Sequence, residues 1–372
     1  MTEIALRRLR NSRLAGAPFE TPEDAVAWFG AVQSQDYAAA KWGIGQRTAA
    51  TTDAAIDALF DAGRILRTHV LRPTWHFVLP ADIRWLLALT GPRVKVASAY
   101  QYRQLELDER IFGRAHTVLV RAMEGGRQLT RPEIARAYDE AGVDASGLRL
   151  ALLVMRAELD AVICSGPRRG RQFTYVLLEE RVPPAPTMDR DTALAELASR
   201  YFASHGPAGA ADFAWWSGLT VTDARKAIDA AGPRIRREEM GGRTFWAADG
   251  GPVAMAPDAS AGGRRSTRGG DVAGTASPAV HLLPNYDELT VGYRDRSALL
   301  GPELQVAGPG FILSNVVTRD GRIVGAWRRR VEQDGVAVTV DLATPLDAAG
   351  RAALERAAGR YGDFLGVPVT LA

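Results

Sequence analysis

The chain has 372 residues, 47% hydrophobic and 24% charged, with a formal net charge of +3; these values indicate several globular domains and a mildly basic protein. No apolar run approaches the ~20 residues of a membrane-spanning helix, and the basic N-terminus is not followed by the apolar segment of a signal peptide. Cys164 is the only cysteine, which excludes an intrachain disulfide, and with five scattered histidines it argues against a structural zinc site. The composition therefore predicts a cytoplasmic protein without a metal or another cofactor.

The first third of the chain predicts helices followed by strands. A short helix is expected at 3–14, and Thr21, Pro22 and two acidic residues begin another that we expect to continue to about Gln35. A threonine–aspartate pair begins a third helix at 52–63, and the stretch 69–78 is rich in β-forming residues. Helix, helix and then a basic, strand-rich ribbon is the order of a winged-helix domain.

The same order recurs in the second third. Thr130 and the following Arg-Pro-Glu repeat the helix start for a helix to about Ala141, and an amphipathic helix is expected at 146–159. Two strands are expected within 162–178, around the basic turn 166–171. This copy predicts a second winged-helix domain with a basic wing.

A third copy follows a proline-rich linker at 182–186. Helices are expected at 191–204 and 220–231, and a β-hairpin at 234–248. Three imperfect copies of this kind favour tandem domains over one large fold.

The remainder changes character. A Gly/Ser/Arg-rich segment at 257–278 is expected to be mobile. It is followed by two Asp-Gly turns, a helix at about 346–360 and alternating strands, expected at 280–283, 311–317, 323–331, 336–342 and near Val367. The predicted fold class is α+β, with winged-helix domains at 1–105, 106–186 and 187–256, the mobile segment at 257–278, and a β-rich, barrel-like domain at 279–372.

Four motifs occur in an order that resembles a known family. They are AVQSQD at 31–36, RPTWHFV at 72–78, DFAWWSG at 212–218, and HLLPNYDEL at 281–289 followed by GYRDR at 292–296. The set resembles the AlkZ family of bacterial DNA glycosylases over nearly the whole chain. The resemblance implies three winged-helix domains and a C-terminal β-barrel. It also implies excision of bulky N-alkylated purines, crosslinks included, from double-stranded DNA, often for self-resistance in antibiotic producers.

The family's catalytic motif is two glutamines separated by one residue, which is usually apolar. Here the motif is Gln33-Ser34-Gln35, so the resemblance implies that Gln33 and Gln35 are catalytic, with serine in place of the apolar residue. A related branch has aspartate at the second position, and this chain has glutamine there.

The two amides suit one kind of chemistry. On a regular helix Gln33 and Gln35 would point about 200° apart, so they converge only if the helix ends or distorts near them. An amide is no general base, but it can orient a water molecule. Orientation suffices for an N7-alkylated purine, whose positive charge already weakens the glycosidic bond, and the predicted products are an abasic site and a free base. Lys41 looks exposed and the motif holds no lysine, which argues against lyase chemistry.

Each of these site residues also has a structural interpretation. The glutamines could be a polar helix end or satisfy polar groups at a domain contact. Asp36 could serve as a base or stabilise the cationic sugar, or could be a helix-terminus or turn residue. His76 could face DNA or lie in the core of a strand, and Asp287 with Glu288 could place negative charge near the sugar or cap a turn.

Aromatic and basic residues leave similar alternatives open. The Trp215-Trp216 pair fits a core better than a surface on which bases stack. Arginine far outnumbers lysine. This excess could reflect the bidentate contacts that arginine makes with phosphates, or it could reflect a GC-rich genome. The arginines with expected phosphate contacts are Arg168, Arg169 and Arg171 in the second wing, Arg264, Arg265 and Arg268 in the mobile segment, and Arg328, Arg329 and Arg330 on a strand; solvated loops or hairpins are the alternative.

Two classes of function follow. One is a monofunctional DNA glycosylase for alkylated purines, acting at the nucleoid in DNA repair. The other is a non-catalytic winged-helix DNA-binding protein, either a regulator or a drug-sequestering protein. Regulators usually dimerise, whereas three winged-helix units in one chain favour a monomer that wraps one duplex.

Overall fold

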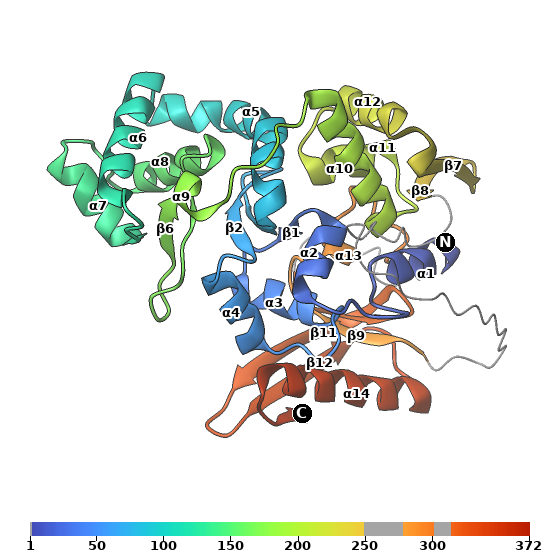
Figure 1. Cartoon of the computed structure of the whole chain (residues 1–372). Coiled ribbons are helices and arrows are strands. Elements are labelled where there is room, and N and C mark those ends of the chain that lie inside the picture. The colour runs from blue at the N-terminus through green and yellow to red at the C-terminus, as the bar shows by residue number, and fades with distance from the viewer. Residues whose placement is uncertain (1, 249–277, 301–313) are drawn as a thin grey trace, which may run out of the picture.

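The computed structural model describes residues 2–248, 278–300 and 314–372 (Figure 1). Arg264, Arg265 and Arg268 lie outside the described residues, as do nearly all of the segment 257–278 and the first part of the strand expected at 311–317. In the part of the chain that the structure describes, no helix is both long enough and apolar enough to cross a membrane.

One order of elements occurs three times. A helix is followed by a very short strand or a single β-bridge, then by two helices, and then by a hairpin whose second strand pairs with that short strand or bridge. The first copy comprises α2 (Pro22–Phe29), β1 (Val32–Gln33), α3 (Tyr37–Gly45), α4 (Asp53–Asp61), β2 (Leu66–His69) and β3 (Trp75–Val78).

The other two copies follow along the chain. The second comprises α6 (Glu109–Met123), β4 (Leu129–Thr130), α7 (Arg131–Glu140), α8 (Leu148–Leu159), β5 (Ile163–Ser165) and β6 (Thr174–Leu177). The third comprises α10 (Arg190–His205), a bridge between Ala208 and Trp246, α11 (Ala210–Ser217), α12 (Val221–Ala231), β7 (Ile235–Met240) and β8 (Arg243–Ala248). In addition, α1 (Thr2–Asn11) precedes the first copy, α5 (Pro80–Gln104) joins it to the second, and α9 (Leu178–Arg181) follows the second.

The C-terminal part is a five-stranded sheet with the strand order β13-β12-β11-β10-β9. Both Asp-Gly turns join neighbouring antiparallel strands as the sequence predicted, one between β10 and β11 and one between β11 and β12. In the described residues β9 and β13 are its edges, and α14 packs against both of them. The elements are β9 (Val280–Leu283), α13 (Glu288–Val291), β10 (Val316–Arg319), β11 (Arg322–Val331), β12 (Val336–Leu342), α14 (Ala348–Leu365) and β13 (Val369–Leu371).

The structure corrects the expectation around the glutamine motif. The helix that begins after Thr21 ends at Phe29, not near Gln35, because Gly30 adopts a left-handed φ of 76° there. The chain then becomes extended, so that Gln33 lies on β1. A helix that the sequence analysis did not anticipate, α3, follows at once and is capped by Asp36.

A second correction concerns Lys41, which was expected to be exposed. Only 3% of its surface is accessible, and its ammonium group donates hydrogen bonds of 2.7 Å to both Asp53 and Asp57. Two carboxylates compensate the burial of this charge, and neither is close to Lys41 in the sequence. Lys41 is therefore held inside the first copy.

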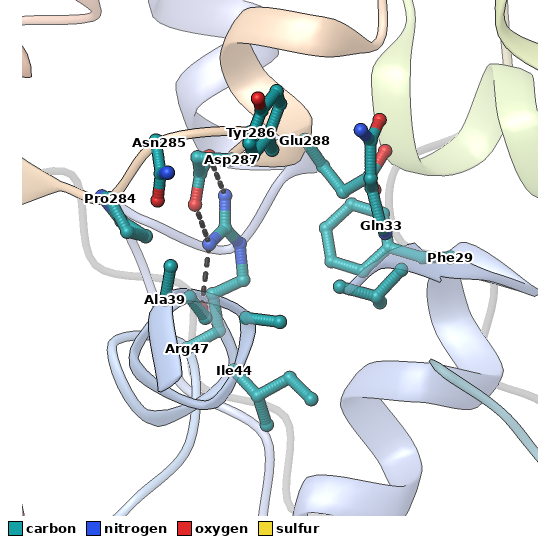
Figure 2. Close-up of a pocket in the computed structure, with 13 residues that line it drawn as sticks. Phe29, Gln33, Ala39, Ile44, Arg47, Pro284, Asn285, Tyr286, Asp287 and Glu288 are labelled. Carbon is teal, nitrogen blue, oxygen red and sulfur yellow. Dashed lines mark hydrogen bonds and ion pairs between the residues drawn. The ribbon is translucent and has the colours of Figure 1, made fainter. Parts of the chain in front are cut away.

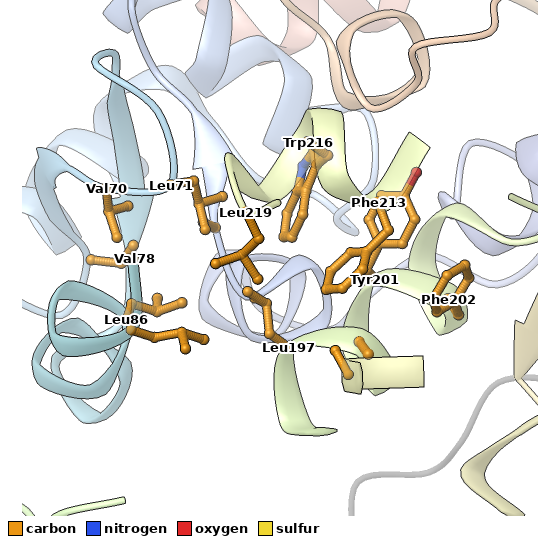
Figure 3. Close-up of a cluster of buried hydrophobic side chains, with 14 of the residues drawn as sticks. Val70, Leu71, Val78, Leu86, Leu197, Tyr201, Phe202, Phe213, Trp216 and Leu219 are labelled. Atoms are coloured by element: carbon orange, nitrogen blue, oxygen red, sulfur yellow. The ribbon is translucent and has the colours of Figure 1, made fainter. Parts of the chain in front are cut away.

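Hydrophobic contacts join the copies into one body. Leu71 of the β2–β3 turn and Leu219 lie in one buried cluster with Tyr201 of α10 and with Phe213 and Trp216 of α11 (Figure 3). Another cluster joins α3 to the C-terminal sheet and α14. These two clusters therefore connect the first copy with the third copy and with the C-terminal sheet, whereas a third cluster belongs almost entirely to the second copy.

Gly218 sets the approach of α11 to the β2–β3 turn. It ends α11 with a φ of 70°, and a Cβ atom placed on it would lie 2.0 Å from the carbonyl oxygen of Leu71. The adjacent residue, Arg72, contacts Gln33, so this close approach contributes to the placement of the site.

We expect Gly218→Ala to destabilise the chain more than the matched change Gly366→Ala. Gly366 has a similar φ of 69° at the end of α14, but open space surrounds the place of its missing Cβ atom. Gly366→Ala should lower the free energy of unfolding by about 1–2 kcal/mol, because alanine disfavours a positive φ. Gly218→Ala should lower it by about 2 kcal/mol more, because the added Cβ atom would also clash with the carbonyl oxygen of Leu71. Urea unfolding measures both values, and equal losses would contradict the packing described.

Candidate active site

Gln33 is held rigidly at the centre of the candidate site. It lies directly opposite His76 in the antiparallel pair of β1 and β3, and only 7% of its surface is accessible. Its backbone N–H donates to Oε1 of Glu288 at 2.7 Å, and its side-chain Oε1 accepts from Nη2 of Arg72 at 2.8 Å. Because a guanidinium group can only donate, the amide oxygen must face Arg72 and the amide NH₂ group must point elsewhere.

Gln35 lies just beyond β1 and is exposed. Its side-chain oxygen accepts from the backbone N–H of Trp75 at 3.4 Å, and the intervening Ser34 is buried. Residues two apart in extended backbone lie on the same face, whereas on a helix they diverge. No helix spans the motif, because Gln33 lies on β1 and Gln35 lies in the bend that follows it, so the divergence expected on a regular helix does not apply to this pair.

Glu288, at the start of α13, collects hydrogen bonds from three separate parts of the chain. Besides the backbone of Gln33, Nε1 of Trp216 lies 2.9 Å and Nε2 of His205 lies 3.2 Å from its Oε2. Burial alone would raise the pKa of this carboxyl group. Three interactions outweigh burial and lower the pKa to about 2: the hydrogen bond with His205, the electrostatic interaction with His205, and the hydrogen bond from the backbone of Gln33. Glu288 is therefore a buried, ionised acceptor that fixes the position of Gln33.

Asp287 has a structural partner of its own. Its two carboxylate oxygens each lie 2.7 Å from a guanidinium nitrogen of Arg47, and both side chains are buried (Figure 2). Asp287 also caps α13 by accepting from the backbone N–H of Leu289 at 2.9 Å. Its carboxylate is thus engaged in the contact between the α3 region and the 284–288 loop.

Asp36, the rival catalytic residue, is the N-cap of α3. Its Oδ1 accepts from the backbone N–H of Ala39 at 3.0 Å, and its side chain is exposed to solvent. This is the helix-terminus role that was the structural alternative.

His76 is completely buried beside Gln33. Its Nδ1 lies 2.9 Å from the carbonyl oxygen of Thr74, and its Nε2 has no hydrogen-bond partner among the residues that the structure describes. Burial, and then the positive charge of Arg72, lower its pKa to about 3. At neutral pH His76 is therefore an uncharged imidazole that donates from Nδ1 to Thr74.

A small cavity lies beside these groups, between β1, α3 and the 284–288 loop (Figure 2). Gln33, Arg47, Asp287 and Glu288 contribute to its lining, and its volume is about 10 Å³. That volume accommodates about one water molecule and is far too small for a purine.

Six of the predicted DNA-binding arginines lie in the described residues, three on the 166–171 turn and three on β11. Arg168 is engaged internally, with its guanidinium 2.7 Å from Asp57 and its backbone N–H bonded to Asp61. Arg169 and Arg171 are both exposed on the same turn, and Arg169 pairs with Glu133 at 2.7 Å. On β11 the side chains of Arg328, Arg329 and Arg330 are exposed, and Arg329 donates to Tyr361 while Arg330 donates to Glu332.

Three residues of this site were missed by sequence reasoning, namely Arg47, Arg72 and His205. Arg72 begins one of the quoted motifs, so its position beside a strand could have indicated a role. His205 carried no comparable signal, because it ends a helix 83 residues away from Glu288. In the described part of the chain no cluster of three or more metal-ligating side chains is present.

Comparison with known proteins places these groups in a family. The family model described as DNA glycosylase AlkZ-like matches residues 26–364, which include every residue of the site. The chain belongs to the AlkZ-like DNA glycosylase family.

Relatives of the AlkZ-like family agree with this assignment. The chain is 26% identical over 323 residues to the "Interstrand DNA cross-link repair glycosylase" of Streptomyces sahachiroi, covering 82% of this chain and 81% of the relative. The solved structure of the Streptomyces sahachiroi DNA glycosylase AlkZ superposes with a TM-score of 0.72 at 21% identity, covering 100% of this chain and 99% of that one. The AlkZ fold therefore extends over the whole chain.

We expect His76 to make the stability of this AlkZ-like chain sensitive to acid. The pKa of His76 is about 3 in the folded chain, below the ~6.5 of an exposed imidazole. At pH values between these two, the unfolded chain therefore binds more protons than the folded chain does. The stability that depends on uncharged His76 is present above about pH 6.5 and is lost as the pH falls toward 3. His76→Asn, which can still donate to Thr74, should reduce the pH dependence of the unfolding free energy between pH 6 and 4 by up to about 1.4 kcal/mol per pH unit. Denaturant titrations at several pH values measure this slope, and an unchanged slope would show that His76 is not buried and neutral.

Proposed function

We propose that this DNA glycosylase hydrolyses the N-glycosidic bond of bulky or cationic N-alkylated purines, with Gln33 and Gln35 orienting the attacking water. The observation that carries the proposal is the fixed position of Gln33, whose backbone N–H donates to Glu288 and whose side-chain amide oxygen accepts from Arg72. The name of the Streptomyces relative supports crosslinked or otherwise bulky lesions as the substrate class. Repair, or self-resistance in an antibiotic producer, is the corresponding biological role.

The proposed step needs little help from acids or bases. The positive charge of an N7-alkylated purine makes it a good leaving group, so the sugar acquires oxocarbenium character as the bond to the base breaks. Water attacks C1′, its proton leaves to solvent, and the products are the free base and an abasic site. The NH₂ group of Gln33 and the carbonyl oxygen of Gln35 would hold this water through one donated and one accepted hydrogen bond.

The neighbouring carboxylates are assigned other roles in this proposal. Glu288 is a positioning residue, because its two oxygens already accept from three N–H groups. Asp287 is neutralised by Arg47, and Asp36 caps α3, so both are secondary to the glutamines. His76 supports the backbone of β3 instead of acting as a base, since its low pKa makes it a weak proton acceptor at neutral pH.

The proposal extends to how DNA is bound. The recurring order of elements supports three winged-helix units at 1–105, 106–186 and 187–256, and the five-stranded sheet supports a separate β-rich unit at 279–372, for which a barrel-like form stays a prediction. Exposed Arg171 and the exposed arginines of β11 would contact phosphates of double-stranded DNA. Three such units in one chain favour a monomer that wraps one duplex, and its substrate would be chromosomal DNA in the cytoplasm. Membership of the glycosylase family favours this enzyme over a non-catalytic DNA-binding protein.

We expect wild-type protein to release 7-methylguanine from methylated DNA in buffer containing EDTA, and Gln33→Ala and Gln35→Ala each to slow this release. Loss of one hydrogen bond that positions the water should lower the single-turnover rate constant on the order of 10–1,000-fold. Affinity for DNA should change little, because orientation and not binding is lost. The double variant should lose less than the product of the two single effects, since one water molecule is held jointly.

Asp36→Asn provides the control for this prediction. Its side chain remains able to cap α3, so the variant should keep most of the wild-type rate. If Asp36→Asn abolishes release while both glutamine variants remain active, Asp36 is the catalytic group and the proposal for the glutamine pair is wrong.

A further inference from the structure

The two neighbouring tryptophans of α11 differ sharply in exposure. Trp216 is completely buried and donates to Glu288, whereas 45% of the surface of Trp215 is accessible. Among the described Phe, Trp and Tyr residues, only Tyr100 of α5, at 64%, shares this degree of exposure. The expectation that the pair belongs to the core is therefore correct for Trp216 and wrong for Trp215.

Trp215 is anchored to the same short helix that holds Gln33. Its indole N–H donates to the carbonyl oxygen of Val291 at 3.3 Å, at the end of α13. Arg296 donates to the neighbouring carbonyl oxygen of Thr290 at 2.9 Å, and its guanidinium carbon lies 5.6 Å from the centroid of a Trp215 ring. Since Glu288 begins α13, one four-residue helix, about 6 Å long, separates this aromatic–cationic pair from the anchor of Gln33.

The size of the cavity beside Gln33 determines where a lesion can lie. A volume of about 10 Å³ admits a water molecule but no nucleobase, so an alkylated purine must remain at the accessible surface beside the glutamines. With C1′ of the lesion near Gln33, a large substituent on the purine extends several ångströms beyond the sugar. The exposed indole of Trp215, at the opposite end of α13 from Glu288, offers a flat, polarisable face to an aromatic or cationic group.

We propose that Trp215, backed by Arg296, is a stacking surface for the extended substituent of a bulky N-alkylated purine. The inference rests on the proposed glycosylase function and adds a residue that determines lesion preference. Trp215 contacts the lesion beyond the reacting sugar, so it contributes to excision of large adducts and little to excision of a methylated base. Tyr100 lies on α5, outside the elements that form the site, and serves as the matched exposed aromatic residue.

The test compares two duplex substrates that differ only in the N7 substituent of one guanine, methyl or benzyl. Trp215→Phe and Trp215→Leu both remove the indole N–H and its bond to Val291, but only phenylalanine retains an aromatic face. We expect Trp215→Leu to lower the single-turnover rate constant for the benzyl adduct about 10-fold more than that for the methyl adduct, within the range of base–aromatic stacking. Trp215→Phe should differ from wild type by less than about 3-fold on either substrate, and Tyr100→Leu should change neither rate.

Several results would overturn the inference. One is that Trp215→Leu lowers the rate constants for both adducts equally, or lowers neither. Another is that Trp215→Phe and Trp215→Leu have equal rate constants for the benzyl adduct. Wild-type protein that excises the methylated base but not the benzyl adduct would also contradict it, while leaving the proposed function intact. Wild-type protein that excises neither base would contradict the proposed function itself.

Discussion

The buried carboxylate of Glu288 is the interaction on which the rest of the site depends. Its oxygens accept from the backbone of Gln33, the indole of Trp216 and the imidazole of His205, which belong to β1, α11 and α10. An ionised carboxylate inside a protein is tolerated only when donors surround it. The first copy of the repeated order, the third copy and α13 must therefore meet at one point, and Gln33 lies at that point.

Rigid contacts extend outward from Glu288 in two directions. Toward the β2–β3 turn, Arg72 fixes the orientation of the Gln33 amide, and Gly218 lets α11 approach that turn closely. Toward the surface, the last carbonyl groups of α13 hold Trp215 and Arg296. A site that orients water instead of activating it needs this rigidity, because a loosely held amide would lose most of its effect.

Local signals in the sequence predicted local structure well. The cap at Thr21 and both Asp-Gly turns were placed correctly, because each depends on a few adjacent residues. Gly30 could have shown that the helix ends there, but apolar Ala31 and Val32 continue its pattern into what proved to be β1. The partners of Glu288 could not be predicted, since they lie 72 to 255 residues away and no local pattern marks them.

The most direct test of this account is a double-mutant cycle in single-turnover release of 7-methylguanine. Glu288→Gln introduces an NH₂ donor where three N–H groups converge, so it should slow release on its own by loosening Gln33. Gln33→Ala retains the backbone N–H but removes the side chain that Glu288 positions. The account predicts that adding Glu288→Gln to Gln33→Ala slows release by less than about 3-fold further, because nothing remains to be positioned. If the two losses multiply, Glu288 acts on the reaction independently of Gln33 and the central claim is wrong.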